Sequence, residues 1–475
     1  MAEEKNNGIN RREFLKLAGV GTLGAGLAGS TLLQGCNFFA NEKDAASAPK
    51  PNMEPTGPMT YRTTEKGDKV SILGYGMMRL PTNDEGEIDQ EMVNKLVDYA
   101  LAHGVNYFDT APPYMKGKSE DATGIALSRH PRSSYYIATK MSNHRMALSG
   151  LTGKELYNAS VEMYRTSMKK LKTDYIDYYL MHNVGGDTGI PFLKQRFFDC
   201  GLIEFLKKER EAGRIRNLGF SFHGKVEVFD YLLSLHNEIH WDFVQIQLNY
   251  LDWKHAAENK GWTANVNAEY LYDELAKRNI PSVIMEPLLG GRLSNVHDHV
   301  VARLKQRAPE ASVASWAFRF AGTYPKVLSV LSGMTYMEHL QDNLCTYSPL
   351  KPLNDEELKF LFDTADLMMQ YPTVNCNDCK YCMPCPYGID IPGIFVHYNK
   401  CVNEGRIASG VHDENYRKAR KEFLVGYDRS VPKLRQANHC TGCNQCSPKC
   451  PQGLNIPEEL RKIDAYVESL KRVGG

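Results

Sequence analysis

Eight of the twelve cysteines lie in two short groups near the C-terminus, and their spacing is typical of metal ligands. The first group reads CNDCKYCMPCP and the second reads CTGCNQCSPKCP. Three thiolates at intervals of three residues let one short loop reach three corners of a [4Fe–4S] cube. Zinc sites usually separate their CxxC pairs by a dozen or more residues. The sequence therefore predicts two [4Fe–4S] clusters, with the ligands Cys376, Cys379, Cys382, Cys385, Cys440, Cys443, Cys446 and Cys450.

The fourth cysteine of each group precedes a proline, and this arrangement resembles that of two-cluster ferredoxins. In those proteins the fourth cysteine of one group ligates the other cluster. The resemblance implies that Cys450 joins the first three cysteines of the first group, and that Cys385 joins the first three of the second. The first group has two residues rather than three before its fourth cysteine, so the uncrossed pairing stays open.

Region 351–475 also carries helical signals around the cysteines. The segments CPYGIDIPGIF and CPQGLNIPEEL form an internal repeat. In each, Asp390 or Asn455 can cap a helix that has a proline just inside its start. Between the cysteine groups, FVHYNKCVNEG and ENYRKARKEFL have helical patterns, and Asn354 or Asp355 can cap an earlier helix. We expect a small, mainly α-helical domain that resembles the helical type of two-cluster ferredoxin.

A second set of polar residues could carry out acid–base chemistry. Reducing a carbonyl by hydride transfer requires a proton donor for the developing alkoxide. A tyrosine phenol has a pKa near 10, and a nearby ammonium lowers that pKa. In this set Lys140 would supply the ammonium, Asp109 would hold Lys140 charged and in place, and His182 would orient the carbonyl oxygen. Tyr114 would then act as general acid in reduction and as general base in oxidation.

The same four residues lie at or just after the ends of three successive apolar runs. Near-continuous apolar runs that alternate with amphipathic helical patterns are typical of parallel strands covered on both faces. Catalytic residues lie at the carboxyl ends of the strands in a (β/α)8 TIM barrel. No GxGxxG follows the first run, which disfavours a doubly wound sheet. We therefore predict an α/β fold with eight barrel strands, at 72–78, 105–110, 135–141, 175–182, 215–222, 243–250, 282–288 and 327–334.

Two local patterns support this barrel. The segment YRTTEKGDKVSI predicts a hairpin before the first strand. In the first barrel helix, Asp89 can cap the start and Gly104 can end it. Its predicted apolar face consists of Met92, Val93, Leu96, Val97 and Ala100.

The set FDTAPPY…GKSE, ATK and MH resembles the aldo-keto reductase family, and the resemblance covers about 61–350. The stretches LGYGMMRLP, GFSFHG, VQIQLNY, EPLLGGRL and SGMTYMEHLQDNL follow in the order that the family has them. The resemblance implies a nicotinamide cofactor as hydride carrier and a carbonyl or alcohol as substrate. It also implies that the cofactor contacts Gly76, Met77, Met78, Ser221, Gln247, Glu286, Leu288, Gly333 and Met334.

Two details of the substrate and cofactor stay open. Many NADP-dependent members of the family hold the 2′-phosphate with basic residues after the eighth strand, where GMTYMEHLQDN offers only His339. NADP and NAD are therefore both compatible with the sequence. The insertions 183–199 and 254–267 at the barrel mouth contain Gly, Trp and His, which is compatible with a sugar or another polar carbonyl substrate.

Residues 1–36 predict an export signal of the twin-arginine type. The motif NRREFLK is followed by an uncharged stretch rich in Gly and Ala that ends in LLQGC. This ending resembles a lipobox, in which Cys36 would become lipidated. Residues 37–60 contain several prolines and predict a tether. We expect a periplasmic or cell-envelope lipoprotein of a bacterium, exported folded because its clusters are inserted in the cytoplasm.

The whole chain therefore predicts an exported oxidoreductase with a barrel at 61–350 and an electron-transfer domain at 351–475. In the alternative hypothesis the barrel is a binding scaffold and the clusters pass electrons to a redox-partner protein. In a third, the clusters only brace a lid over the barrel mouth. A hydride carries two electrons, a cube accepts one, and no flavin site is evident, so transfer from barrel to clusters is not implied. The net charge of +1 gives no sign of a nucleic-acid partner.

Overall fold

A computed structural model describes residues 54–185, 189–256, 266–408, 410 and 412–472. The predicted export signal, the lipobox with Cys36 and most of the tether lie outside the described residues.

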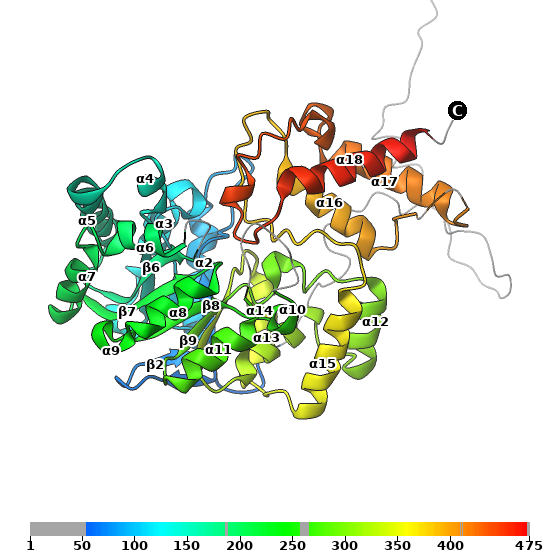
Figure 1. Ribbon diagram of the computed structural model, residues 1–475. Coiled ribbons are helices and arrows are strands. Elements are labelled where there is room, and N and C mark those ends of the chain that lie inside the picture. Colours follow the sequence, from blue (N-terminus) through cyan, green and yellow to red (C-terminus); the bar gives the residue numbers. More distant parts are fainter. Residues whose placement is uncertain (1–53, 186–188, 257–265, 409, 411, 473–475) are drawn as a thin grey trace, which may run out of the picture. The chain divides into compact units, whose positions relative to one another are not determined.

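Eight parallel strands close into a barrel, in which each strand pairs with the next and the last pairs with the first (Figure 1). This topology confirms the predicted (β/α)8 fold. The strands are β3 (Leu73–Gly76), β4 (Tyr107–Asp109), β5 (Tyr136–Met141), β6 (Ile176–Val184), β7 (Ile215–Phe222), β8 (Phe243–Gln247), β9 (Ser282–Met285) and β10 (Val327–Ser332).

Several strands end earlier than the apolar pattern predicts. β9 ends at Met285 instead of continuing to residue 288, because Glu286 and Leu289 adopt positive φ angles of 54° and 47°. β8 likewise ends at Gln247. At these points the backbone leaves the extended conformation and turns into loops at the carboxyl end of the barrel, where the predicted site lies.

Helices surround the barrel (Figure 1). The principal ones are α2 (Gln90–Ala102), α3 (Ser119–Leu127), α5 (Gly153–Lys170), α7 (Leu202–Glu211), α8 (Val226–Ser234), α11 (Ala268–Lys277), α13 (Val313–Thr323) and α14 (Met337–Tyr347). The other helices are α4 (His144–Leu148), α6 (Gly189–Phe197), α9 (His236–Ile239), α10 (Asp252–His255) and α12 (Asp298–Arg307).

The first helix begins as predicted, since the Asp89 side chain accepts a hydrogen bond from the backbone N–H of Met92. Val93, Leu96, Val97 and Ala100 are buried against the barrel core. The prediction for Met92 is wrong, because its side chain lies on the exposed side of the helix.

The predicted hairpin consists of the antiparallel strands β1 (Tyr61–Thr63) and β2 (Lys69–Ser71). Val70 of this hairpin is fully buried and belongs to the cluster that fills the barrel interior, together with Tyr107, Tyr178 and Phe243. The hairpin therefore packs against the interior of the barrel.

After the barrel, the chain forms α15 (Asp355–Met368), α16 (Ile391–Asn403), α17 (Tyr416–Ser430) and α18 (Ile456–Arg472). Asn354 and Asp390 cap α15 and α16 with their side chains. Leu361 and Ala365 of α15 belong to the barrel core. Helices α16, α17 and α18 lie side by side (Figure 1) and share a separate, smaller core.

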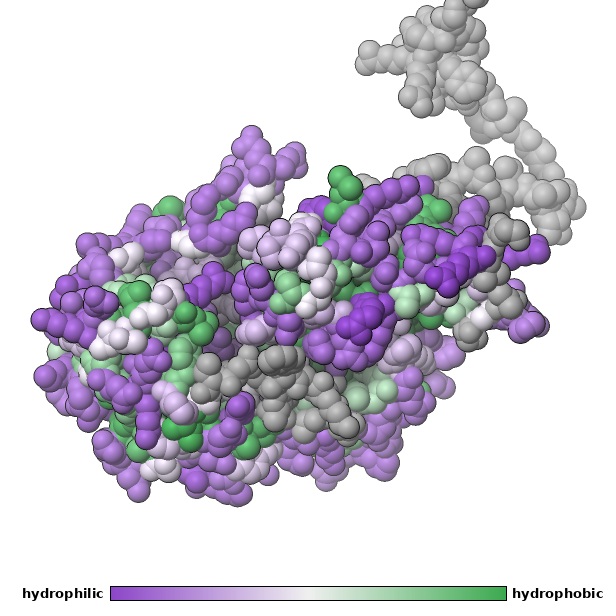
Figure 2. Space-filling view, turned by 45° about the horizontal axis from the view of Figure 1, so that its top comes forward, coloured by the Kyte–Doolittle hydropathy of each residue, from purple (hydrophilic) through white to green (hydrophobic). Residues whose placement is uncertain are grey.

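Within the described residues, no helix combines the length and the apolar character needed to cross a membrane. The face of the molecule drawn in Figure 2 is mainly hydrophilic, and its apolar residues form small scattered groups.

Candidate active site

The structure brings Asp109 and Lys140 together in a buried ion pair. Asp109 ends β4 and Lys140 lies on β5, the neighbouring strand. Lys140 Nζ donates to Asp109 Oδ1 at 2.5 Å and to the backbone oxygen of Thr110 at 2.8 Å. Both side chains are almost completely buried. Because the second acceptor belongs to the backbone, the ammonium is held in position by the strand ends themselves.

Tyr114 and His182 lie next to this pair. Lys140 Nζ is 5.0 Å from the centroid of the Tyr114 ring, and the rings of Tyr114 and His182 are 6.0 Å apart in an edge-to-face arrangement. His182 Nδ1 is 2.5 Å from Ser142 Oγ. If the hydroxyl donates to Nδ1, the imidazole proton is on Nε2, where it can be donated to a substrate oxygen.

Burial dominates the electrostatics of these four residues. It raises the pKa of Asp109 and lowers the pKa of Lys140, while the charge of each partner opposes both shifts. Burial, Lys140 and neighbouring imidazoles keep the pKa of His182 well below its usual range, so His182 is neutral at pH 7.

The pKa of Tyr114 differs from the prediction. It is raised well above 10, by burial first and then by Tyr381, Asp109 and Glu286. The direction is opposite to that predicted from Lys140 alone, because removal of the phenol from water is the larger effect.

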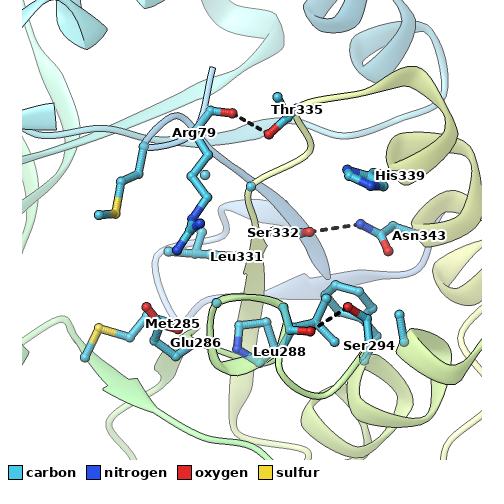
Figure 3. A pocket seen from close by; sticks show the side chains of 18 of the residues that line it. Arg79, Met285, Glu286, Leu288, Ser294, Leu331, Ser332, Thr335, His339 and Asn343 are labelled. Atoms are coloured by element: carbon cyan, nitrogen blue, oxygen red, sulfur yellow. Dashed lines mark hydrogen bonds between the residues drawn. The ribbon is translucent and has the colours of Figure 1, made fainter. Parts of the chain in front are cut away.

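A cavity of about 330 Å³ opens beside this group and has Asp109 and Tyr114 in its wall. Other walls come from the loops after β3, β9 and β10 and from α14. In Figure 3, Arg79 and Glu286 face the cavity, while His339 and Asn343 extend from α14. Gln245 also lines the cavity, and its Oε1 is buried with no hydrogen-bond partner among the described residues.

Five of the nine predicted cofactor contacts line this cavity, namely Gly76, Met78, Glu286, Leu288 and Gly333.

The other four predicted contacts do not line it. Met77 and Met334 are fully buried, and the Met334 carbonyl accepts a hydrogen bond from Tyr75. Ser221 accepts from the backbone N–H of Asn183. The side-chain amide of Gln247 donates to Asp252 Oδ2. Each of these side chains faces the packed interior or another cavity, which an alignment of motifs does not reveal.

Sequence reasoning missed Arg79 as a cavity residue. Arg79 follows the first barrel strand within the quoted stretch LGYGMMRLP, and it is one of two basic side chains among the residues that line the cavity. The other is His339, and Glu338 and Asp342 lie on the same helix. The available signal for Arg79 was a basic residue within this stretch, directly after the first barrel strand.

The eight motif cysteines fall into two spatial sets. Cys376, Cys379, Cys382 and Cys450 line one small cavity together with apolar side chains such as Ile391 and Phe395.

The second set consists of Cys385, Cys440, Cys443 and Cys446. The pKa of Cys446 is raised, by burial first and then by the charges of the other three cysteines. Across the described part of the chain, however, no three His, Cys, Asp or Glu side chains are arranged to hold a metal ion.

Comparison with known proteins gives one family. The family model described as "Aldo/keto reductase family" matches residues 72–361. The chain is 31% identical over 160 residues to "Probable aldo-keto reductase 1" of Glycine max, which is 33% of this chain and 42% of that protein. It is 24% identical over 313 residues to "L-galactose dehydrogenase" of Arabidopsis thaliana, covering 61% of this chain and 88% of that protein.

Among solved structures, the chain is similar to an aldo-keto reductase from Klebsiella pneumoniae in complex with NADPH. The TM-score is 0.49 at 21% identity, over 65% of this chain and 96% of that one.

Proposed function

The chain belongs to the aldo/keto reductase family, and we propose that it transfers a hydride between a nicotinamide nucleotide and a carbonyl or alcohol substrate. The observation that carries this proposal is the buried Lys140–Asp109 pair beside Tyr114 and His182 at the strand ends. Burying two charges is unfavourable unless their geometry is tightly held. A binding scaffold has no physical need for such a pair next to a buried phenol.

The protein's own residues supply the acid–base chemistry. His182 donates from Nε2 to the substrate oxygen and orients it, while Tyr114 gives the proton to the same oxygen in reduction and removes it in oxidation. Asp109 fixes Lys140, whose ammonium stabilises negative charge on the phenolate. The strand ends hold these groups in place before substrate binds, which reduces the reorganisation needed in the transition state.

The cavity beside Tyr114 fits a nicotinamide nucleotide. When bound, the nucleotide supplies or accepts the hydride. Gly76, Met78, Arg79, Glu286 and Gly333 would hold it. The buried Oε1 of Gln245 fits a ligand that brings a hydrogen-bond donor, such as a carboxamide.

The charge of the cavity wall favours NAD(H) over NADP(H). Glu338 and Asp342 bring two carboxylates to the segment where relatives hold a 2′-phosphate, and His339 is the one basic residue beside them. Carboxylates at this position oppose binding of the additional 2′-phosphate, which carries the same sign of charge. Titration of the protein with NADH and NADPH measures this preference directly.

We further propose that the C-terminal region is ferredoxin-like and carries two [4Fe–4S] clusters, which would supply one-electron transfer. The crossed cysteine sets support this pairing of ligands, and the cavity of the first set is enclosed by apolar side chains. A cube separates its four sulfur ligands with iron and sulfide atoms. A thiolate set for a cube therefore differs in geometry from a set for a single ion.

A second candidate function, electron transfer to a partner protein, is favoured by Cys443. Its side chain is exposed, unlike that of Cys382 in the first set. A cluster near the surface exchanges electrons with another protein more readily than a buried one.

For the location of the protein we propose export, directed by the twin-arginine motif. For its substrate we propose a sugar or another polar carbonyl, in keeping with the name of the plant dehydrogenase.

The test is the nicotinamide and iron content of the exported protein, purified without oxygen and then denatured. We expect about one nicotinamide and about eight irons per chain, since each cube holds four irons. Iron without nicotinamide, together with no binding of added NADH or NADPH, would reject the oxidoreductase and favour the electron-transfer function.

A further inference from the structure

We propose that the cysteine-bearing segment 376–382 supports one wall of the oxidoreductase site, with Asn377 as a positioning residue for the cofactor cavity. The inference rests on the proposed function, because it assigns the cavity to a nicotinamide nucleotide.

Asn377 bridges two oppositely charged residues of the cavity wall. Its Nδ2 donates to Glu286 Oε1 at 2.9 Å, and its backbone oxygen accepts from Arg79 Nη2 at 2.7 Å. Asn377 is only 4% exposed. Both partners line the cavity, whereas Asn377 itself lies behind them. Loss of the amide would leave the Glu286 carboxylate buried with one donor fewer.

A close backbone approach seats this segment on the barrel. Gly290 has a positive φ of 67°, and a Cβ at this position would lie 2.0 Å from the backbone oxygen of Asn377. Glycine is therefore required for the barrel loop to pass directly under the segment. Gly290 also lines the cavity, so the contact lies at the site and not at a distant surface.

The cysteines on either side hold Asn377 in place. Asn377 lies between Cys376 and Cys379. Anything that fixes the thiols of this segment also fixes the side chain that contacts Glu286. The C-terminal region thus completes the site and couples the state of its cysteines to nucleotide binding.

The test compares nucleotide binding by the wild-type holoprotein and by the variants Asn377→Ala and Asn377→Asp. The aspartate variant keeps the shape but replaces the donor with a carboxylate facing Glu286. We expect the Kd for NADH, followed by fluorescence, to rise at least about tenfold in both, with iron content unchanged. A hydrogen bond to a charged group is typically worth this much or more.

The matched control is Asn403→Ala. Asn403 also donates from the C-terminal region to the barrel, to the backbone oxygen of Asn295, but it does not line the cofactor cavity. We expect its Kd to equal that of wild type. Wild-type binding together with unchanged binding by both Asn377 variants overturns the inference. A wild-type protein that binds neither NADH nor NADPH overturns the proposed function, and the inference with it.

Discussion

The barrel and the C-terminal helices place their functional groups in different ways. In the barrel, Asp109, Lys140 and His182 lie on neighbouring strands, and all three are buried. In the C-terminal region the motif cysteines lie in segments between helices, and of the eight only Cys382 is buried while Cys443 is exposed. The barrel site is thus fixed by backbone pairing, whereas the cysteine segments have little regular structure to hold them.

The hydrophobic cores of the barrel and of the C-terminal region also differ, in their size. The barrel core extends through all eight strands and most of the surrounding helices. The core of the C-terminal region is small, and five of the motif cysteines pack against it only as partly buried groups, as do Tyr466 and Leu454. Small domains with little apolar core commonly depend on bound metal for stability. The comparison predicts that the barrel folds without its cofactor and that the cysteine segments do not hold their arrangement without iron.

The largest expected effect is on turnover. Tyr114→Phe removes the proton donor but keeps the ring, and kcat for carbonyl reduction should fall by roughly 100- to 10,000-fold. The absorbance of the proposed iron–sulfur clusters should be unchanged, because the variant alters only the barrel. Steady-state kinetics with NADH measure the loss, and Tyr387→Phe is the control. Wild-type turnover in Tyr114→Phe would show that another group donates the proton.

The next effect concerns iron and separates the two regions. Cys382→Ser should lose about four irons per chain, one cube's content, because it removes a buried ligand of the first set. Thermal unfolding should show an earlier transition for the C-terminal helices and an unchanged one for the barrel. The matched control is Cys401→Ser, at a buried cysteine that lies outside both sets. Equal iron in the two variants would contradict the proposal that Cys382 is a cluster ligand.

The difference between the regions also explains what the sequence could predict. The barrel strands are buried, largely apolar runs, and Asp109, Lys140 and His182 lie at or near the carboxyl ends of three of them, so local pattern alone indicated these residues. The cysteine spacing is equally local. The contacts of Asn377 with Arg79 and Glu286 join positions 298 and 91 residues apart, and no local pattern encodes them. Four of the predicted cofactor residues failed to reach the cavity for a related reason, since motif order does not determine which way a side chain faces.

Acid should weaken each region through its buried histidines, of which His144 and His397 are examples. The pKa of His144 in the barrel is about 3 and that of His397 in the C-terminal region is about 4, mainly because both are buried. Below about pH 6.5 the unfolded chain binds a proton at each position and the folded chain does not. The free energy of unfolding should therefore fall by about 2 kcal/mol per histidine between pH 6.5 and 5.

Denaturant unfolding at the two pH values measures this loss. His144→Gln should reduce the acid sensitivity of the barrel transition, and His397→Gln that of the C-terminal transition. Each variant serves as the control for the other. If either substitution altered both transitions equally, the two regions would unfold as one unit and the comparison would not hold for stability.

The smallest effect locates the boundary between the two regions. The Asn354 side chain caps α15 by accepting from the Glu357 N–H. The Glu357 carboxylate in turn accepts from the Asn354 N–H, which completes a capping box. Asn354→Ala should lower the free energy of unfolding by about 1 kcal/mol. Because Leu361 and Ala365 of α15 pack in the barrel core, the loss should appear in the barrel transition.

Asn415 provides the matched control for this cap. It stands at the same position before α17, but its side chain makes no capping hydrogen bond. Asn415→Ala should therefore leave both transitions almost unchanged, while Asn354→Asp should retain the wild-type value because a carboxylate also accepts from the Glu357 N–H. A shift of the C-terminal transition in Asn354→Ala would assign α15 to the cysteine-bearing region, and the barrel would then end with α14.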